Sequence, residues 1–159
     1  MAVAMTHVFH NLASENCMIM IYLSREANFC AAHKLYNPEW SKEKNEEVFG
    51  PCANENWHGH NFDLTVTVRG EPDPSTGFVM NFKDLNQIIR TGILEKVDHK
   101  NLNLDVPFLA GKLTSCETMV IEFWKILDPM IRHASNDRAQ LHCLRLRETP
   151  KNYAEYYGS

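Results

Sequence analysis

The segment that begins at His58 constrains the fold more than any other part of this chain, because it alternates polar and apolar residues. Such alternation is typical of a β-strand with one face in the core and the other in solvent. Four apolar residues share one face, namely Phe62, Leu64, Val66 and Val68. Extended backwards, the pattern places His58 and His60 on one side, about 7 Å apart at about 3.3 Å per residue. Two imidazoles so placed can bind the same metal ion.

The hydrophobic pattern also predicts one strand before this segment and a hairpin near the end of the chain. The first strand is expected over Met18 to Leu23, and Phe29 to His33 continues it, with room for a bulge between them. The hairpin is expected over Leu141 to Glu148 and Asn152 to Tyr157, joined by a short turn. We expect these strands to pair in one sheet.

Two helices are predicted between the central strand and the hairpin. Asn81 is a suitable N-cap for the first helix, which weakens at Gly92 and ends near Val97. The second helix begins at a capping box from Thr114 to Glu117, and Pro129 is expected to kink or close its last turns. The order ββααββ predicts an α+β domain with a four-stranded antiparallel sheet and two helices on one face.

Length and charge limit the classes of protein to which the chain can belong. A single domain over residues 18–159 accounts for the pattern, and residues 1–17 are expected to form a frayed extension. The net charge of −4 and the pI of about 6.0 argue against nucleic-acid or membrane binding, which need a basic surface. Five cysteines without a C-x-x-C pair fit a reducing compartment better than a disulfide framework. A cytoplasmic protein without nucleic-acid or membrane partners is therefore expected.

A third histidine can complete a metal site with the first two. His33 lies at the expected end of the first strand, 58 − 33 = 25 residues before His58. Three histidines with one open position allow Zn²⁺ to act as a Lewis acid. The alternative is that His58 and His60 are unconnected loop histidines, and the motif alone favours neither interpretation, because short motifs also match by chance.

Cys52, just upstream of the histidine pair, is a candidate general base or nucleophile. A free thiol has a pKa near about 8.5 and is mostly protonated at neutral pH, so Cys52 needs a partner. Asp98 and His99 offer one, because a carboxylate can orient an imidazole that accepts the thiol proton. Such adjacent residues interact more readily in a turn than in a strand. Spacing alone favours a simpler interpretation, a polar helix end at which the dipole favours histidine.

Two glutamates are further candidates. Glu148 shares the expected inner face with Leu144 and Leu146, and a carboxylate directed inward is costly without hydrogen-bond donors. A pterin or guanine edge would supply them through its ring N–H and exocyclic amine. The alternative places Glu148 at a strand end, where it reaches solvent. Glu117 is already explained by the capping box.

Several short motifs recur in order along the chain. They are Phe29 to His33, Phe49 to Cys52, Trp57 to Asn61, Asp73-Pro74-x-x-Gly77-x-Val79, Asp98 to Leu102, Ser115-x-Glu117 and Glu148-Thr149. Together they resemble the 6-pyruvoyl-tetrahydropterin synthase family, which includes the bacterial 6-carboxy-tetrahydropterin synthase branch. The resemblance covers nearly all of the chain after residue 17 and favours the zinc interpretation. The chain departs from the family at Asn81, where many relatives have Asp, and at Cys116 and Thr118, beside Glu117.

The resemblance implies a T-fold and a set of site residues. Subunits of this family form trimers whose sheets join into a barrel, and two trimers stack as a homohexamer. The implied ligands of one Zn²⁺ per subunit are His33, His58 and His60. Cys52 would be the catalytic base, activated across a subunit boundary by Asp98 and His99 of a neighbour. Glu148 would anchor the pterin ring, and Glu117 would be a second glutamate near the substrate.

The implied substrate is 7,8-dihydroneopterin triphosphate, from which triphosphate is eliminated. The expected product is 6-pyruvoyl-tetrahydropterin, for a tetrahydrobiopterin route, and the segment from Asp98 to Phe108 favours this branch. The alternative is 6-carboxy-tetrahydropterin for queuosine biosynthesis, with release of acetaldehyde. Two other classes remain open: a zinc hydratase or hydrolase in which Cys52 is a bystander, and a non-catalytic module whose zinc is structural.

Overall fold

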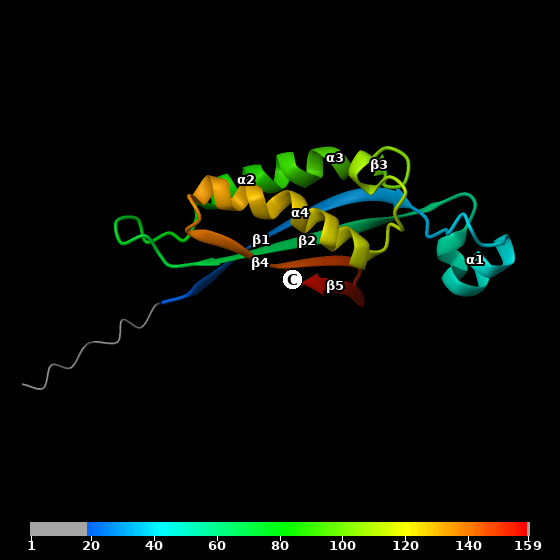
Figure 1. The fold of residues 1–159 in the computed structure, drawn as a ribbon, viewed down its shortest axis with the longest axis horizontal. Helices are drawn as coiled ribbons and strands as arrows, with labels where there is room; N and C mark the ends of the chain where they lie inside the picture. The colour runs from blue at the N-terminus through cyan, green and yellow to red at the C-terminus, as the bar shows by residue number, and fades with distance from the viewer. Residues whose placement is uncertain (1–18, 159) are drawn as a thin grey trace, which may run out of the picture.

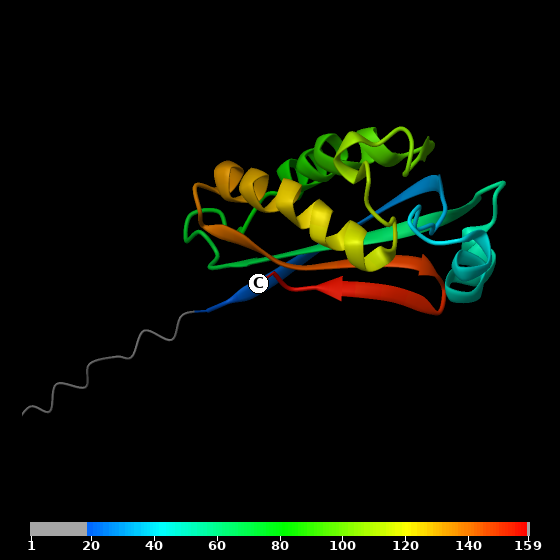
Figure 2. The same cartoon turned by 45° about the vertical axis from the view of Figure 1, so that its right-hand side comes forward.

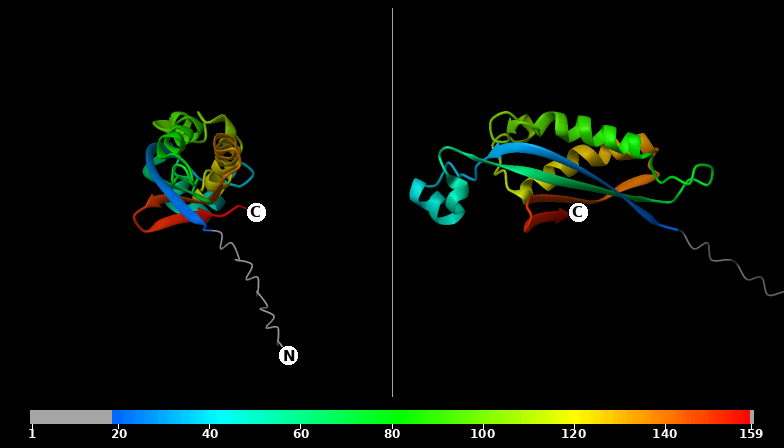
Figure 3. Two further views of the ribbon diagram at one scale, coloured as in Figure 1. Left: turned by 90° about the vertical axis from the view of Figure 1, so that its left-hand side faces the viewer. Right: turned by 180° about the vertical axis from the view of Figure 1, so that it is seen from behind.

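The computed structural model describes residues 19–158, which form one sheet with helices on one face. Figure 1 and Figure 2 show the helices of residues 82–97 and 116–135 above the sheet, and the two views in Figure 3 show the same two layers from the end and from behind. The predicted frayed extension, residues 1–17, lies outside the described residues. Within the described part, no helix is both long and apolar enough to cross a membrane.

The sheet has five strands in the order β3-β1-β2-β4-β5. Their bounds are Ile21–His33 for β1, His58–Gly70 for β2, Lys100–Asn101 for β3, Ala139–Thr149 for β4 and Asn152–Tyr156 for β5. The pairs β1 with β2, β2 with β4 and β4 with β5 are antiparallel. The pair β1 with β3 is parallel. The expectation of four antiparallel strands was therefore wrong, because two-residue β3 is too short to show a hydrophobic period.

The alternation that predicted β2 is confirmed in the core. Phe62, Leu64, Val66 and Val68 are all 0% exposed. Strand β1 is continuous, without the bulge for which the sequence left room, and it pairs with β2 along its whole length. The irregular strand is instead β4, whose pairing with β5 shifts between Arg147 and Thr149. Glu148 is the extra residue at this shift, as in a β-bulge.

The first predicted helix region is confirmed in a modified form. Helix α2 spans Phe82–Ile89, and the Oδ1 atom of its N-cap Asn81 accepts a hydrogen bond from Lys83 N at 2.8 Å. The helix continues as a π-helical turn over Arg90–Leu94 and ends with α3 at Glu95–Val97. The π-helical turn contains Gly92, where an added Cβ would lie 3.2 Å from the Leu127 side chain. The glycine at which the helix was predicted to weaken thus lets this π-helical turn approach the helix that contains Leu127 closely.

The second predicted helix, α4, spans Cys116–Ser135 and runs through Pro129 rather than ending there. Its N-cap is Ser115, whose Oγ atom accepts a hydrogen bond from Thr118 N at 3.4 Å. The predicted capping box from Thr114 to Glu117 was therefore wrong. A shorter helix, α1 at Lys42–Phe49, precedes a 3-10 turn at Gly50–Ala53 and lies beyond the end of the sheet (Figure 1).

Candidate metal centre and active site

The three predicted metal ligands meet where β1 ends and β2 begins. His33 and His58 are direct partners in the antiparallel register, and His60 lies two residues further along β2. The ring centroids are 4.5 Å apart for His33 and His58, and 4.9 Å apart for His58 and His60. One nitrogen from each ring lies within 4.8 Å of the other two. The cross-strand register therefore explains how residues 25 positions apart converge.

His33 is fully buried and is held by a backbone acceptor. Its Nδ1 atom donates a hydrogen bond to the Thr114 carbonyl oxygen at 2.9 Å. The ring proton is then on Nδ1, and Nε2 presents a lone pair toward the other two histidines. A ring nitrogen fixed in this way is the usual arrangement of a metal-binding histidine.

Several buried imidazole nitrogens in the described residues have no hydrogen-bond partner. They are Nε2 of His33, both ring nitrogens of His58 and Nε2 of His60. Buried polar atoms are almost always satisfied, so a group of unsatisfied imidazole nitrogens around one point indicates a site for a cation. Three imidazoles are the donor set that Zn²⁺ takes in catalytic sites. The residues present therefore fit a zinc ion.

Burial keeps two of the three histidines, His33 and His58, neutral. It lowers the pKa of His33 to about 4, against a smaller opposing effect of the Thr114 carbonyl. Burial also lowers the pKa of His58, and the neighbouring His60 adds to that effect. Neutral imidazole is the form that binds a metal, because the ligand must offer a free lone pair.

Glu148 projects into the same site from the bulge between β4 and β5. Its Oε1 atom lies 3.4 Å from His33 Nε2 and 3.8 Å from His60 Nε2. The side chain is 23% exposed, so it does not simply extend into solvent from the strand end. The inward orientation expected from its alternation with Leu144 and Leu146 is thus observed.

Cys52 lies half-buried in the 3-10 turn between α1 and β2. Its carbonyl oxygen accepts a hydrogen bond from Leu35 N at 2.9 Å, which ties the turn to the segment that follows His33. Burial raises the pKa of the Cys52 thiol, and the negative charge of Glu148 raises it further. Within one chain the sulfur is therefore a protonated thiol, and it needs a proton acceptor to become reactive.

Asp98 and His99 form a pair at the other side of β1. His99 has a φ of 57°, and this turn brings its Nδ1 atom to 3.0 Å from Asp98 Oδ2. The second oxygen of Asp98 accepts a hydrogen bond from Cys30 N at 2.9 Å, and this bond is the main cause of the lowered pKa of Asp98. Asp98 and His99 can therefore interact although they are adjacent in sequence, because the chain turns at His99 instead of continuing as a strand.

The structure does not bring this pair to the thiol of its own chain. The His99 side chain is 83% exposed, and in the described part of the chain it makes no contact with Cys52. Glu117 is also exposed, and its carboxylate makes no hydrogen bond or ion pair within residues 19–158. Its charge does reach Cys116, where burial, Glu148 and Glu117 together raise the thiol pKa to about 12.

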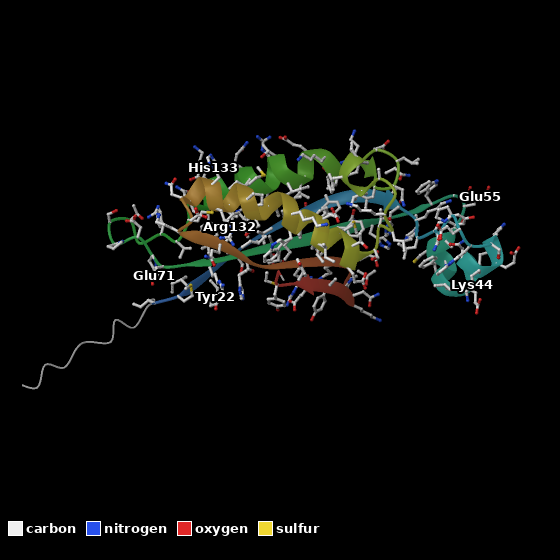
Figure 4. The ribbon with its side chains drawn as sticks, in the orientation of Figure 1. Tyr22, Lys44, Glu55, Glu71, Arg132 and His133 are labelled. Atoms are coloured by element: carbon white, nitrogen blue, oxygen red, sulfur yellow. The ribbon has the colours of Figure 1, made fainter. Side chains whose placement is uncertain are left out.

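Two supporting residues were not identified from the sequence. Thr114 was interpreted as part of a capping box, whereas its carbonyl oxygen holds His33. Asn103 donates from Nδ2 to the Lys34 carbonyl oxygen and accepts from Lys34 N, both at 3.1 Å, so it fixes the backbone just after His33. The one sequence signal for the role of Asn103 was the high asparagine content of the segment after His99. The site lies at the end of the sheet near α1, where Figure 4 labels Glu55, away from Tyr22 and Glu71.

Comparisons with known proteins agree with this geometry. The family model described as 6-pyruvoyl tetrahydropterin synthase matches residues 22–159. The 6-pyruvoyl tetrahydrobiopterin synthase of Homo sapiens is 38% identical over 136 residues, which are 86% of this chain and 90% of that protein. The protein of the same name from Drosophila melanogaster is 38% identical over 86% of this chain and 79% of its own length. The solved structure of Caenorhabditis elegans 6-pyruvoyl tetrahydropterin synthase is 35% identical, with a TM-score of 0.82, and the match covers 89% of this chain and 98% of that one.

Proposed function

This chain belongs to the 6-pyruvoyl tetrahydropterin synthase family, and from that premise we propose that it is a zinc-dependent lyase. It converts 7,8-dihydroneopterin triphosphate to 6-pyruvoyl-tetrahydropterin with elimination of triphosphate. The observation that carries this proposal is the convergence of three histidines, with unsatisfied buried nitrogens, beside Glu148. The names of the matched relatives favour the pyruvoyl product.

The three histidines would hold one Zn²⁺ per subunit. Bound there, the ion would supply Lewis-acid stabilisation of negative charge that develops on substrate oxygens. His33 is the most firmly placed ligand, because the Thr114 carbonyl fixes its ring and burial keeps it neutral. The donor set leaves one position open for substrate, as catalytic zinc requires.

Cys52 is the proposed group that moves protons to and from the substrate side chain. Its raised pKa means that an acceptor must take the thiol proton first. Asp98 stays ionised, because Cys30 N and His99 stabilise its carboxylate, and it holds His99 through Nδ1. The Nε2 atom of His99 is then free to accept the proton.

Since His99 points outward, we propose that it serves Cys52 of a neighbouring subunit. That arrangement requires an assembly, and we propose the homohexamer, a dimer of trimers, with active sites between subunits. Glu148 would anchor the pterin ring by accepting hydrogen bonds from two adjacent N–H groups. Glu117, exposed on the first turn of α4, is the proposed second glutamate near the substrate. The hexamer and the cytoplasmic location remain predictions.

A turnover assay tests the proposal against its alternatives. The purified protein, loaded with Zn²⁺, is expected to release triphosphate from 7,8-dihydroneopterin triphosphate without forming acetaldehyde. Release of acetaldehyde would identify the 6-carboxy-tetrahydropterin reaction of the queuosine route instead. The variant Cys52→Ala is expected to keep its zinc and lose turnover, and full activity in that variant would favour a zinc hydratase or hydrolase. A structural zinc module would unfold when the metal is removed.

A further inference from the structure

One carboxylate oxygen and two imidazole nitrogens face one another in the site without a hydrogen bond between them. Glu148 Oε1 lies 3.4 Å from His33 Nε2 and 3.8 Å from His60 Nε2, and neither nitrogen has a hydrogen-bond partner. His33 cannot donate from Nε2, because its ring proton is on Nδ1 and goes to the Thr114 carbonyl. A carboxylate oxygen and an imidazole lone pair repel each other at this distance unless a cation lies between them.

We propose that Glu148 is the fourth metal ligand in the substrate-free protein, and that it leaves the metal when a pterin ring binds. Zinc bonds of about 2.0–2.1 Å in a tetrahedron place neighbouring ligand atoms about 3.4 Å apart. The distance from Glu148 to His33 matches this value at 3.4 Å, and the distance to His60 is longer, at 3.8 Å. The inference rests on the proposed function, which supplies both the metal and the ring.

The position of Glu148 in the fold suits a ligand that must move. It is the extra residue between the pairs Arg147 with Tyr153 and Thr149 with Asn152, so no cross-strand partner fixes it. Its carboxylate lies beside the histidines, and Glu148 also lines a hollow of about 500 Å³ that His60 borders as well. A carboxylate that exchanges the metal for two ring N–H groups can therefore turn toward this hollow without breaking a cross-strand pair.

Release of Glu148 from the metal would also change the electrostatic environment of two nearby cysteines. Its negative charge reaches Cys52 in the 3-10 turn and Cys116 at the start of α4. In the substrate-free state a bound carboxylate would close the open metal position. Ring binding would free that position for the substrate side chain. The substrate side chain could then reach the metal only after the pterin ring has bound to Glu148.

Metal binding without turnover tests the first half of the proposal. The Zn²⁺ dissociation constant is measured by chelator competition, and the visible spectrum is recorded with Co²⁺, for the unmodified protein, Glu148→Gln and Asp63→Asn. Asp63 borders the same hollow but pairs with Arg147 at 3.9 Å, so this control removes an equal charge away from the histidines. Glu148→Gln is expected to weaken zinc binding at least about tenfold and to change the cobalt spectrum. Asp63→Asn is expected to change neither.

The outcomes separate this inference from the proposed function. One outcome is that Glu148→Gln is folded, by circular dichroism, and shows the same zinc affinity and cobalt spectrum as the unmodified protein. That result would overturn the role of Glu148 as a ligand but would not contradict the proposed zinc-dependent activity. Failure of the unmodified protein to bind Zn²⁺ would overturn both. An equal loss in Asp63→Asn would show that charge in the hollow, rather than a ligand, causes the effect.

Ring binding tests the second half. 7,8-Dihydropterin, which lacks the triphosphate side chain, is added to the Co²⁺-loaded protein while binding is followed by calorimetry. The spectrum is expected to shift toward that of Glu148→Gln, and the spectrum of Glu148→Gln itself should stay constant. A spectrum of the unmodified protein that stays constant at saturating ring concentration would overturn the release of Glu148.

Discussion

Gly59, between two of the proposed zinc ligands, controls how closely β1 and β2 approach at the metal centre. A Cβ atom added at this position would lie 3.2 Å from the Ala31 carbonyl oxygen, with the next two atoms at 3.7 Å. The tight contact is to backbone, which cannot rotate away as a side chain could. In Gly59→Ala, β1 and β2 must therefore separate by a few tenths of an ångström beside His58 and His60.

This small separation is large for a metal site. Ligand distances in such sites are set to within about 0.2 Å, so the three nitrogens would no longer meet the ion together. We expect Gly59→Ala to lower the free energy of unfolding by about 1–3 kcal/mol and to weaken Zn²⁺ binding by about tenfold or more. Urea unfolding of the metal-free protein gives the first quantity, and chelator competition gives the second.

A destabilised control separates the two effects. Val66, on the same strand, is 0% exposed and lies away from the histidines. Val66→Ala is expected to lower the unfolding free energy by about 2 kcal/mol while the folded protein keeps its zinc affinity. Zinc affinity in Gly59→Ala equal to that of the unmodified protein would refute the reasoning, because the strand spacing would then not control the ligand positions.

Three further predictions follow from the same structure. Cys52→Ala and His99→Ala are each expected to be inactive alone. Unfolding and refolding the two variants as a mixture should restore part of the activity, because some sites would then combine an intact thiol with an intact imidazole from the neighbouring subunit. A mixture as inactive as its components would refute the shared site. In the metal-free protein, the pKa of His33 is about 4 in the folded state and 6.5 in the unfolded state. The unfolded state therefore takes up the proton first as the pH decreases. The stability present above pH 6.5 should then fall by about 3 kcal/mol by about pH 4. Urea titrations should show a smaller decrease in His33→Gln. Asn81→Ala should lower the unfolding free energy by about 1 kcal/mol through loss of the helix cap, whereas Asn81→Asp, which retains an acceptor, should cost much less in the same measurement.

The sequence predicted those features that depend on residues near one another in the chain. The alternation after His60 predicted β2 and its buried face, because a strand covered on one side must repeat apolar residues with a period of two. Asn81 predicted the start of α2, because the cap is a contact between neighbours in sequence. The inward direction of Glu148 followed from the same alternation in β4.

Features that depend on distant contacts were missed or interpreted wrongly. Strand β3 exists because its backbone pairs with β1, with His99 N donating to the Cys30 carbonyl at 2.7 Å, and no local pattern reports that contact. Thr114 matched a capping box locally, yet its carbonyl oxygen is used by His33, 81 residues earlier in the chain. The bulge at Glu148 likewise arises from the pairing of β4 with β5 rather than from residue type.

The hydrogen bond from His33 to the Thr114 carbonyl also connects the site to the mobility of a helix. Thr114 immediately precedes the N-cap of the 20-residue α4, in which Met119 N donates to the Ser115 carbonyl at 2.9 Å. When an ion restrains the imidazole, the first turn of α4 loses part of its freedom to open. Amide hydrogens there should then exchange with deuterium more slowly than in the metal-free protein, while those at the far end of α4 exchange at the same rate. Metal binding would thus be detectable as reduced local opening of the first turn of α4.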